Sequence, residues 1–385
     1  MIPYARQNIS EADVAAVVEV LRSDWLTQGP SIERFEEGVR SVIGARHAVA
    51  VHNGTAGLHL ACLALDLGAG DSLWTAANTF VASANCARYC GADVDFVDIE
   101  PDTYNLSVPA LREKLVFAEK AGRLPKIVVP VHFGGQPCDM PAIAELARRY
   151  RFRVVEDASH ALGAELDGDK VGNGRYSDIT ILSFHPVKII TTGEGGMAVT
   201  NNAELAARLR LLRTHGITRD AAQMSGESEG PWYYEQTALG FNYRMTDIQA
   251  ALGTSQLARL DEFIARRRQL AQRYPGLLAG LPVRLPVERA DRKSAWHLYV
   301  INIDERSRKS RRAVYEEMRE RGVGVNVHYI PVHLQPYYRA LGFGEGHCPV
   351  AEKYYQAALT LPLFPALTDA EQDKVGLALR ELLNA

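Results

Sequence analysis

The chain has 385 residues, 47% of them hydrophobic, which is enough to bury a large core across about two domains. With 43 Lys and Arg against 46 Asp and Glu, the formal net charge is −3, which argues against nucleic acid as a partner. The five cysteines form no paired C-x-x-C motif, the N-terminus has no apolar signal segment, and no apolar run approaches the ~20 residues of a membrane span. We therefore expect a cytoplasmic protein with reduced thiols and no membrane partner.

The first 200 residues alternate short apolar runs with stretches of helical periodicity. A capping box at Ser10–Asp13 predicts a first helix. Further helices are expected at 55–65, at 141–150 and from residue 202, and strands at 47–52, 72–76, 94–99, 126–132, 153–157, 178–184 and 196–200. This alternation predicts an α/β fold with a mostly parallel sheet covered by helices.

A different pattern follows. Residues 218–242 are rich in Gly, Ser and aromatic residues and predict a long loop, which in a compact protein is usually functional. One long helix is expected from 246 to about 274. After it we expect a strand at 296–303, a helix near 310–321, a strand at 324–329 and a terminal helix. We divide the chain into a large domain, 1–250, and a smaller C-terminal α+β domain, 251–385.

Three motifs carry candidate chemistry. In the first, the strand at 47–52 ends in Asn53-Gly54-Thr55-Ala56 and leads directly into a helix. The free N–H groups and the positive end of a helix dipole favour an anion such as a phosphate there. The alternative is that Thr55 merely caps the helix.

In the second motif, VVEDASHALG, Asp157 follows a buried strand, which is where ligand groups lie in open parallel sheets. A buried carboxylate needs a cation or strong hydrogen bonds, and a protonated pyridine nitrogen would serve. The alternative is a structural aspartate bonded to backbone N–H groups.

The third motif, ILSFHPVKIITTGEGG, contains Ser183 and Lys188 after another strand. Apolar neighbours should lower the pKa of Lys188, as an amine that forms a Schiff base requires. The alternative is that Lys188 reaches solvent and pairs with Glu194.

The segments EDASHALGA, SFHPVK, TTGEGGM, RTHGI and GFNYRMTDIQAALG together resemble the DegT-type sugar-nucleotide aminotransferases, which are pyridoxal 5'-phosphate (PLP) enzymes of fold type I. The resemblance covers nearly the whole chain. Within that family, IPYARQNIS, SDWLTQGP and VNVHYIPVHLQPYY are most similar to the transaminases of pseudaminic acid biosynthesis, which aminate C4 of a UDP-linked 4-keto-6-deoxy-N-acetylhexosamine with L-glutamate. Ile189 departs from the family pattern, which has proline after the lysine.

The resemblance implies a role for each matching residue. Lys188 would hold PLP as a Schiff base and move the proton, while Asp157 would keep the pyridine nitrogen protonated. The other residues implied at the cofactor are Thr55, Ala56, Phe80, His160, Ser183 and Asn242. Asn242 would come from the neighbouring subunit, which implies a homodimer with shared active sites.

The residues implied at the nucleotide-sugar are Tyr4, Trp25, Leu26, Thr27, Asn326, Val327, His328 and Tyr329. For some matched residues a plainer role remains open: Phe80 as ordinary core packing, and His160 as a satisfied core histidine. We expect no metal at His328 and His333, because no third ligand lies at a suitable spacing.

Other functions remain as alternatives. The substrate could be another nucleotide-linked keto sugar, on TDP or GDP, with a 4-keto or 3-keto group. A PLP sugar dehydratase of the same fold would need Lys188 replaced, usually by histidine. A non-catalytic binding protein would not need the Asp157 and Lys188 pair, and a nicotinamide-dependent oxidoreductase would need a G-x-G-x-x-G after the first strand, which is missing.

Overall fold

The computed structural model describes residues 1–383. Seven strands form the main sheet in the order β1-β9-β8-β5-β4-β2-β3. Their bounds are β1 His47–Val51, β2 Ser72–Ala76, β3 Asp93–Val97, β4 Ile127–Val129, β5 Arg153–Asp157, β8 Ile179–Ser183 and β9 Gly196–Thr200. All are parallel except β9, which runs antiparallel to both neighbours. The predicted α/β class with a mostly parallel sheet is confirmed.

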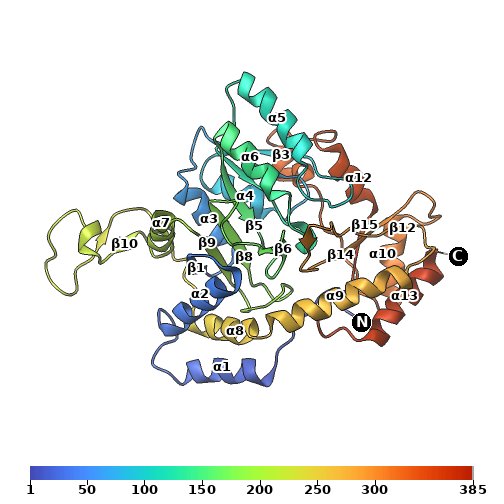
Figure 1. Ribbon diagram of the computed structural model, residues 1–385, viewed down its shortest axis with the longest axis horizontal. Helices are drawn as coiled ribbons and strands as arrows, with labels where there is room; N and C mark the ends of the chain where they lie inside the picture. Colours follow the sequence, from blue (N-terminus) through green and yellow to red (C-terminus); the bar gives the residue numbers. More distant parts are fainter. Residues whose placement is uncertain (384–385) are drawn as a thin grey trace.

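Both faces of the sheet are buried, as the apolar strand sequences require. Alternate residues of β1 point to opposite faces, so Val49 and Val51 join one core while Ala48 and Ala50 join another. The helices around this sheet are α2 Pro30–Ile43, α3 Gly54–Ala64, α4 Ala82–Tyr89, α5 Val108–Lys120, α6 Met140–Tyr150 and α7 Ala203–Arg213 (Figure 1).

A second, antiparallel sheet in the order β12-β14-β15 lies in the C-terminal third of the chain. It is formed by β12 Val283–Arg284, β14 Tyr299–Ile303 and β15 Ala358–Leu361. The helices of this region are α9 Leu260–Leu277, α10 Arg311–Glu320, α11 Pro336–Arg339, α12 Pro349–Ala357 and α13 Asp369–Leu383. Helices α9, α10 and α13 enclose a third core with the sheet, including Tyr274, Tyr299 and Leu379.

The smaller elements connect these parts. They are α1 Glu11–Leu21, the ribbon of β6 Glu165–Leu166, β7 Asp169–Lys170 and β13 Arg292–Lys293, and the pair β10 Ile217–Thr218 and β11 Glu235–Gln236. The β10–β11 region protrudes from the body of the molecule, on the left of Figure 1. Within residues 1–383 no helix combines the length and apolar character that a bilayer crossing needs.

Two predicted elements are wrong. The helix expected from 246 to about 274 is two helices, α8 (Asp247–Leu257) and α9, because α8 packs on α1 and α2 whereas α9 packs on the C-terminal core. The strand expected at 324–329 is absent: only Asn326 pairs with the sheet, at Thr360, and the chain then turns away. We propose the domain boundary at the junction of α8 and α9, a few residues after 250, because residue 250 lies inside α8. We assign the first residues to the smaller domain, since Ile2 bonds to the backbone of Gly322 and Gly324.

Candidate active site

The three motifs converge at one edge of the main sheet. Strands β1, β5 and β8 all end there, so the start of α3, Asp157 and the loop after β8 become neighbours. Strand β9 runs antiparallel to its neighbours, so it begins at this same edge, between the ends of β1 and β8. The approach is very close: a β carbon on Gly54 would lie 3.2 Å from Cβ of Ser183, and one on Gly196 would lie 2.5 Å from the carbonyl carbon of Asn53.

The start of α3 has the properties of an anion site. Asn53 caps the helix, since its Oδ1 accepts from the N–H of Ala56 at 2.8 Å. Thr55 therefore does not cap it, and that alternative is wrong. The N–H groups of Gly54 and Thr55 lie in the first turn, where no intrahelical acceptor exists. With the half-buried Ser183 beside them, these groups can bind a phosphate.

Asp157 ends β5 and is 5% exposed. Its Oδ2 accepts from the Ser83 hydroxyl at 2.6 Å, and its Oδ1 accepts from the N–H of Ser159 at 3.1 Å. Thr79 in turn contacts the Ser83 hydroxyl at 2.8 Å. No ion pair formed within residues 1–383 includes Asp157. A buried carboxylate held only by neutral donors can still receive a cationic N–H from a ligand.

Lys188 lies on the loop between β8 and β9. Backbone bonds from the Lys188 N–H to the His185 carbonyl and from Thr192 to Phe184 hold this loop. Burial lowers the pKa of Lys188 to about 8, although the Asp157 carboxylate raises it. No ion pair with Glu194 forms among the described residues, so the structural alternative for this lysine fails. Such an amine is a competent nucleophile near neutral pH.

His160 connects Asp157's strand to the C-terminal part of the chain. Its Nδ1 accepts from the N–H of Gly134 at 3.3 Å, which leaves the proton on Nε2, and Nε2 lies 3.2 Å from the Tyr329 hydroxyl. Burial, with Lys188 nearby, lowers the pKa of His160 well below its ordinary value. The imidazole is therefore neutral and donates to Tyr329.

Phe80 has an exposed side chain beside the site. Its side chain is 57% exposed, and its ring centroid lies 6.3 Å from that of Tyr329. Ordinary core packing is therefore not its role. A large exposed apolar ring beside buried polar groups is typical of a ligand surface.

Five of the residues expected at the nucleotide-sugar lie together. The ring of Tyr4 is 5.4 Å from that of His328, and Asn326, Val327 and Tyr329 adjoin them in sequence. His328 is buried, and its Nδ1 contacts the Thr360 hydroxyl at 2.8 Å. Burial lowers the pKa of His328 to about 3, so it is neutral.

The remaining expected residues lie apart from this group. Trp25, Leu26 and Thr27 are exposed, and Thr27 pairs with Thr246 at the start of α8. Asn242 is also exposed and pairs with Thr214.

Sequence reasoning missed three residues at this edge. Ser83 and Thr79 hold the Asp157 carboxylate, and the ring of His297 packs 4.4 Å from that of His160. The first two lie on either side of Phe80 in the segment NTFVAS, so their proximity to an expected ligand ring was a usable signal. His297 gave none, because it reaches the site from the second sheet.

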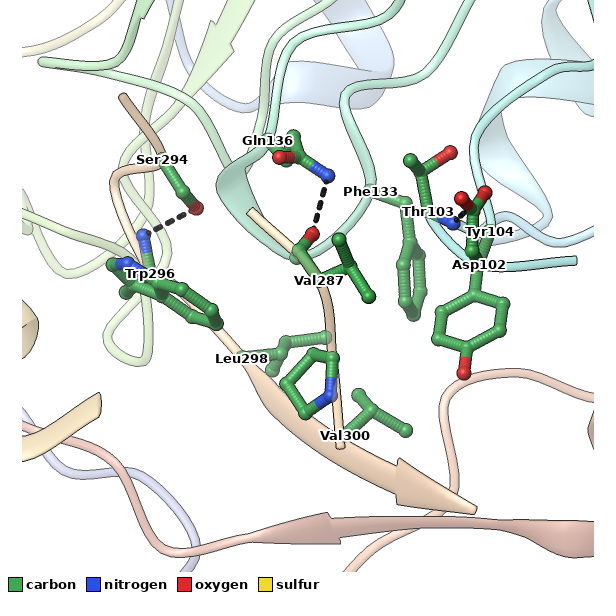
Figure 2. Close-up of a pocket in the computed structure, with 12 residues that line it drawn as sticks. Asp102, Thr103, Tyr104, Phe133, Gln136, Val287, Ser294, Trp296, Leu298 and Val300 are labelled. Atoms are coloured by element: carbon green, nitrogen blue, oxygen red, sulfur yellow. Dashed lines mark hydrogen bonds between the residues drawn. The ribbon is translucent and has the colours of Figure 1, made fainter. Parts of the chain in front are cut away.

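A small cavity of about 30 Å³ lies between Phe133–Gln136 and the segment 286–300 (Figure 2). Phe133, Gly134 and Gln136 face Val287 and other residues of the segment 286–300 across it. Backbone bonds close its rim, from Ala295 to Gly135 at 3.0 Å and from Leu298 to Gly134 at 3.2 Å. A volume of about 30 Å³ is far too small for a nucleotide-sugar. No group of three metal-ligating side chains occurs within residues 1–383.

The chain is similar to known proteins along almost its whole length. The model of the DegT/DnrJ/EryC1/StrS aminotransferase family matches residues 7–380. The spore coat polysaccharide biosynthesis protein SpsC of Bacillus subtilis is 39% identical, over 99% of this chain and 97% of that protein.

Two solved structures are similar over the full length of this chain. The sugar aminotransferase Spr1654 of Streptococcus pneumoniae, described as putative and in its PMP form, has a TM-score of 0.92 with 30% identity and 99% of its chain covered. PseC of Helicobacter pylori, an aminotransferase of pseudaminic acid biosynthesis, has a TM-score of 0.91 with 28% identity and 99% of its chain covered.

Proposed function

Because this chain belongs to the DegT/DnrJ/EryC1/StrS aminotransferase family, we propose that it transfers the amino group of L-glutamate to C4 of a UDP-linked 4-keto-6-deoxy-N-acetylhexosamine, as in pseudaminic acid biosynthesis. That the chain is a PLP-dependent sugar aminotransferase follows from the family and its solved members. The observation that supports the chemistry is that a desolvated amine, Lys188, lies near a buried carboxylate, Asp157, which forms no ion pair among the described residues.

The residues present fit PLP. Thr55, Ala56 and Ser183 would bind its phosphate, Asp157 would bind its ring nitrogen, and Lys188 would hold it covalently. When bound, PLP supplies an electron-accepting ring that makes the α-hydrogen of an amino acid acidic. Phe80 would lie against the ring, and the neutral His160 would donate its Nε2–H to the Tyr329 hydroxyl.

Lys188 would carry the proton. The amine takes the α-proton of glutamate in one half-reaction and delivers a proton to C4 of the sugar in the other. A group that must act as base and then as acid works best with a pKa near the operating pH, and burial brings Lys188 to about 8. Asp157 neither gives nor takes the reacting proton, and in both halves it would bind the ring nitrogen.

The sugar would bind above this edge. Its neighbours would be Tyr4, Asn326, Val327, His328 and Tyr329, with Trp25, Leu26 and Thr27 at the rim. We place Asn242 against the phosphate of a second copy of the chain, so that the dimer shares its sites. The exposure of Asn242, and of Trp232 on the protruding segment at 70%, is consistent with such a contact.

A second candidate is amination of another nucleotide-linked keto sugar. The similarity to SpsC, whose name refers to spore coat polysaccharide, favours this alternative as much as the similarity to PseC favours the first. Purified protein should be incubated with glutamate and a panel of UDP-, TDP- and GDP-linked 4-keto and 3-keto sugars. Product stereochemistry by NMR then identifies the substrate. Turnover of a TDP sugar without turnover of the UDP-4-keto sugar would reject the pseudaminic acid assignment.

We expect the Lys188→Ala variant to have no measurable turnover in either half-reaction. Wild-type protein should show the visible absorbance of bound PLP, lose it on addition of glutamate, and retain it on the peptide containing Lys188 after borohydride reduction. Substantial transamination by the alanine variant would show that another amine carries the proton.

A further inference from the structure

Asp247 binds a distant segment of the chain. It lies in the first turn of α8, is fully buried, and receives two backbone bonds: Oδ2 from the N–H of Gly29 at 2.8 Å and Oδ1 from the N–H of Ser31 at 2.9 Å. Its own N–H donates to the carbonyl of Leu26 at 3.0 Å. The segment 25–31 therefore donates two hydrogen bonds to Asp247, from Gly29 and Ser31, and accepts one from it, at Leu26.

The Asp247 carboxylate does not cap α8, its own helix, but it caps the start of α2: Gly29, the N-cap of α2, has no side chain to do so, and Ser31 lies in the first turn. Thr246 already caps α8 in a capping box with Gln249, and each of these two residues bonds to the other's backbone N–H. The Asp247 side chain instead points to residues that lie more than 200 positions earlier in the chain.

The same end of α8 also holds the loop that carries Lys188. The side-chain amide of Gln249 donates to the carbonyl of Glu194 at 2.8 Å. Met245 packs closely under that loop, since a β carbon on Gly195 would lie 2.7 Å from its Cε. Hence one helix end fixes both the lysine loop and the segment 25–31.

The segment 25–31 has little other support for its tip. Trp25 is 55% exposed and Leu26 is 47% exposed, so their side chains are not anchored in a core. Apart from the bonds between the Ser23 hydroxyl and the backbone of Trp25, their position depends on the polar bonds to α8. The fit is tight as well, because a β carbon on Gly29 would lie 2.5 Å from Cβ of Trp25 and 2.8 Å from Oδ1 of Asp247.

We propose that Asp247 is a positioning residue for the keto-sugar half-reaction, which fixes Trp25, Leu26 and Thr27 relative to the Lys188 loop. The inference rests on the proposed function, since it takes the sugar to lie against this segment. Glutamate is much smaller and does not need a rim built from the segment 25–31. Weakening of these backbone bonds should therefore slow the sugar half-reaction selectively.

Two variants test this. Asp247→Asn removes the charge and places an NH2 group against a backbone N–H, while Gly29→Ala inserts a methyl group between the segment and Asp247. Their matched controls are Asp13→Asn, another fully buried aspartate bonded to α8, and Gly68→Ala, where a β carbon meets nothing within 4 Å. The readouts are rapid-mixing absorbance for each half-reaction, with glutamate or with the UDP-4-keto-6-deoxy sugar, and hydrogen exchange of the amides of 25–31.

We expect both test variants to exchange the amides of 25–31 faster than wild type. They should convert glutamate within twofold of the wild-type rate, and react with the keto sugar about tenfold more slowly, as for one lost hydrogen bond to a charged acceptor. The controls should change neither exchange in 25–31 nor the ratio of the two rates. Equal slowing of both half-reactions, or unchanged exchange in 25–31, would overturn the role of Asp247. Wild-type protein that loses its PLP absorbance with glutamate but does not react with the keto sugar would instead refute the proposed substrate. Hydrogen exchange at 25–31 does not depend on the substrate, so it separates the two failures.

Discussion

Asp13 and Asp157 are both buried carboxylates, but their surroundings differ. Asp13, at the contact of α1 with α8, accepts from the Ser10 N–H, the Ser255 hydroxyl and the Gln256 amide, and Arg259 approaches at 3.4 Å. Burial raises the pKa of Asp13, but these hydrogen bonds outweigh it and lower that pKa. Asp157 has two neutral donors and forms no ion pair among the described residues, although the Lys188 amine is near enough to interact with its charge. The comparison shows how a carboxylate that completes the fold differs from one that keeps capacity for a ligand.

Neutralising Asp157 should have the largest effect on activity. We expect Asp157→Asn to lower kcat by about 10³-fold, because an amide cannot keep the ring nitrogen protonated, a loss of about 4 kcal/mol. The free energy of unfolding of the apoprotein should change by less than about 1 kcal/mol, since no cation is lost. Steady-state kinetics and urea unfolding measure the two effects. A near-normal kcat would mean that another group protonates the ring.

Asp13→Asn should show the opposite profile. Removing a charge bonded to several donors and near Arg259 should lower the free energy of unfolding by about 3 kcal/mol. The kcat should stay within twofold of wild type, because Asp13 lies away from Lys188 and Asp157. A variant with wild-type stability would show that the Asp13 bonds are replaceable by water.

The pH dependence of the free energy of unfolding tests whether the Lys188 amine near Asp157 is desolvated. An unfolded lysine has a pKa of about 10.4, whereas burial lowers that of Lys188 to about 8 in the folded apoprotein. Between these values the unfolded chain binds more protons, so stability rises with pH. From pH 8 to pH 10 we expect the apoprotein to gain about 2 kcal/mol relative to Lys188→Met, allowing for partial exposure. Parallel pH profiles of the two apoproteins would contradict a desolvated amine.

The smallest effect is expected at Ser83, which orients the Asp157 carboxylate. Ser83→Ala should lower kcat about tenfold, or about 1.4 kcal/mol, because one hydrogen bond to the carboxylate is lost. Ser310→Ala, which removes the cap of α10, provides a control with unchanged kcat. If Ser83→Ala were as slow as Asp157→Asn, the hydroxyl itself would have to take part in the chemistry.

The main sheet was predictable because its strands are short apolar runs separated by clear helical patterns. The edge position of Asp157 and Lys188 followed from the rule that parallel strands end together. The strand expected at 324–329 failed because an apolar run cannot reveal that only Asn326 finds a partner. His297 was beyond sequence reasoning too, since its contact with His160 depends on how the second sheet packs on the first.

The N–H groups of Ala295 and Leu298 donate to the carbonyls of Gly135 and Gly134, and these bonds affect how the two domains can move. Gly135 has a φ of 102°, and a β carbon there would lie 2.9 Å from the N of Trp296, so the two backbone segments are in close contact. Enzymes often close over a substrate by rotating one domain against another about a few fixed points. We expect this junction to be such a pivot, with α10 and α13 swinging most and His160 hardly moving. On this expectation, a bound nucleotide-sugar moves the smaller domain toward the large one while Lys188 and Asp157 keep their positions.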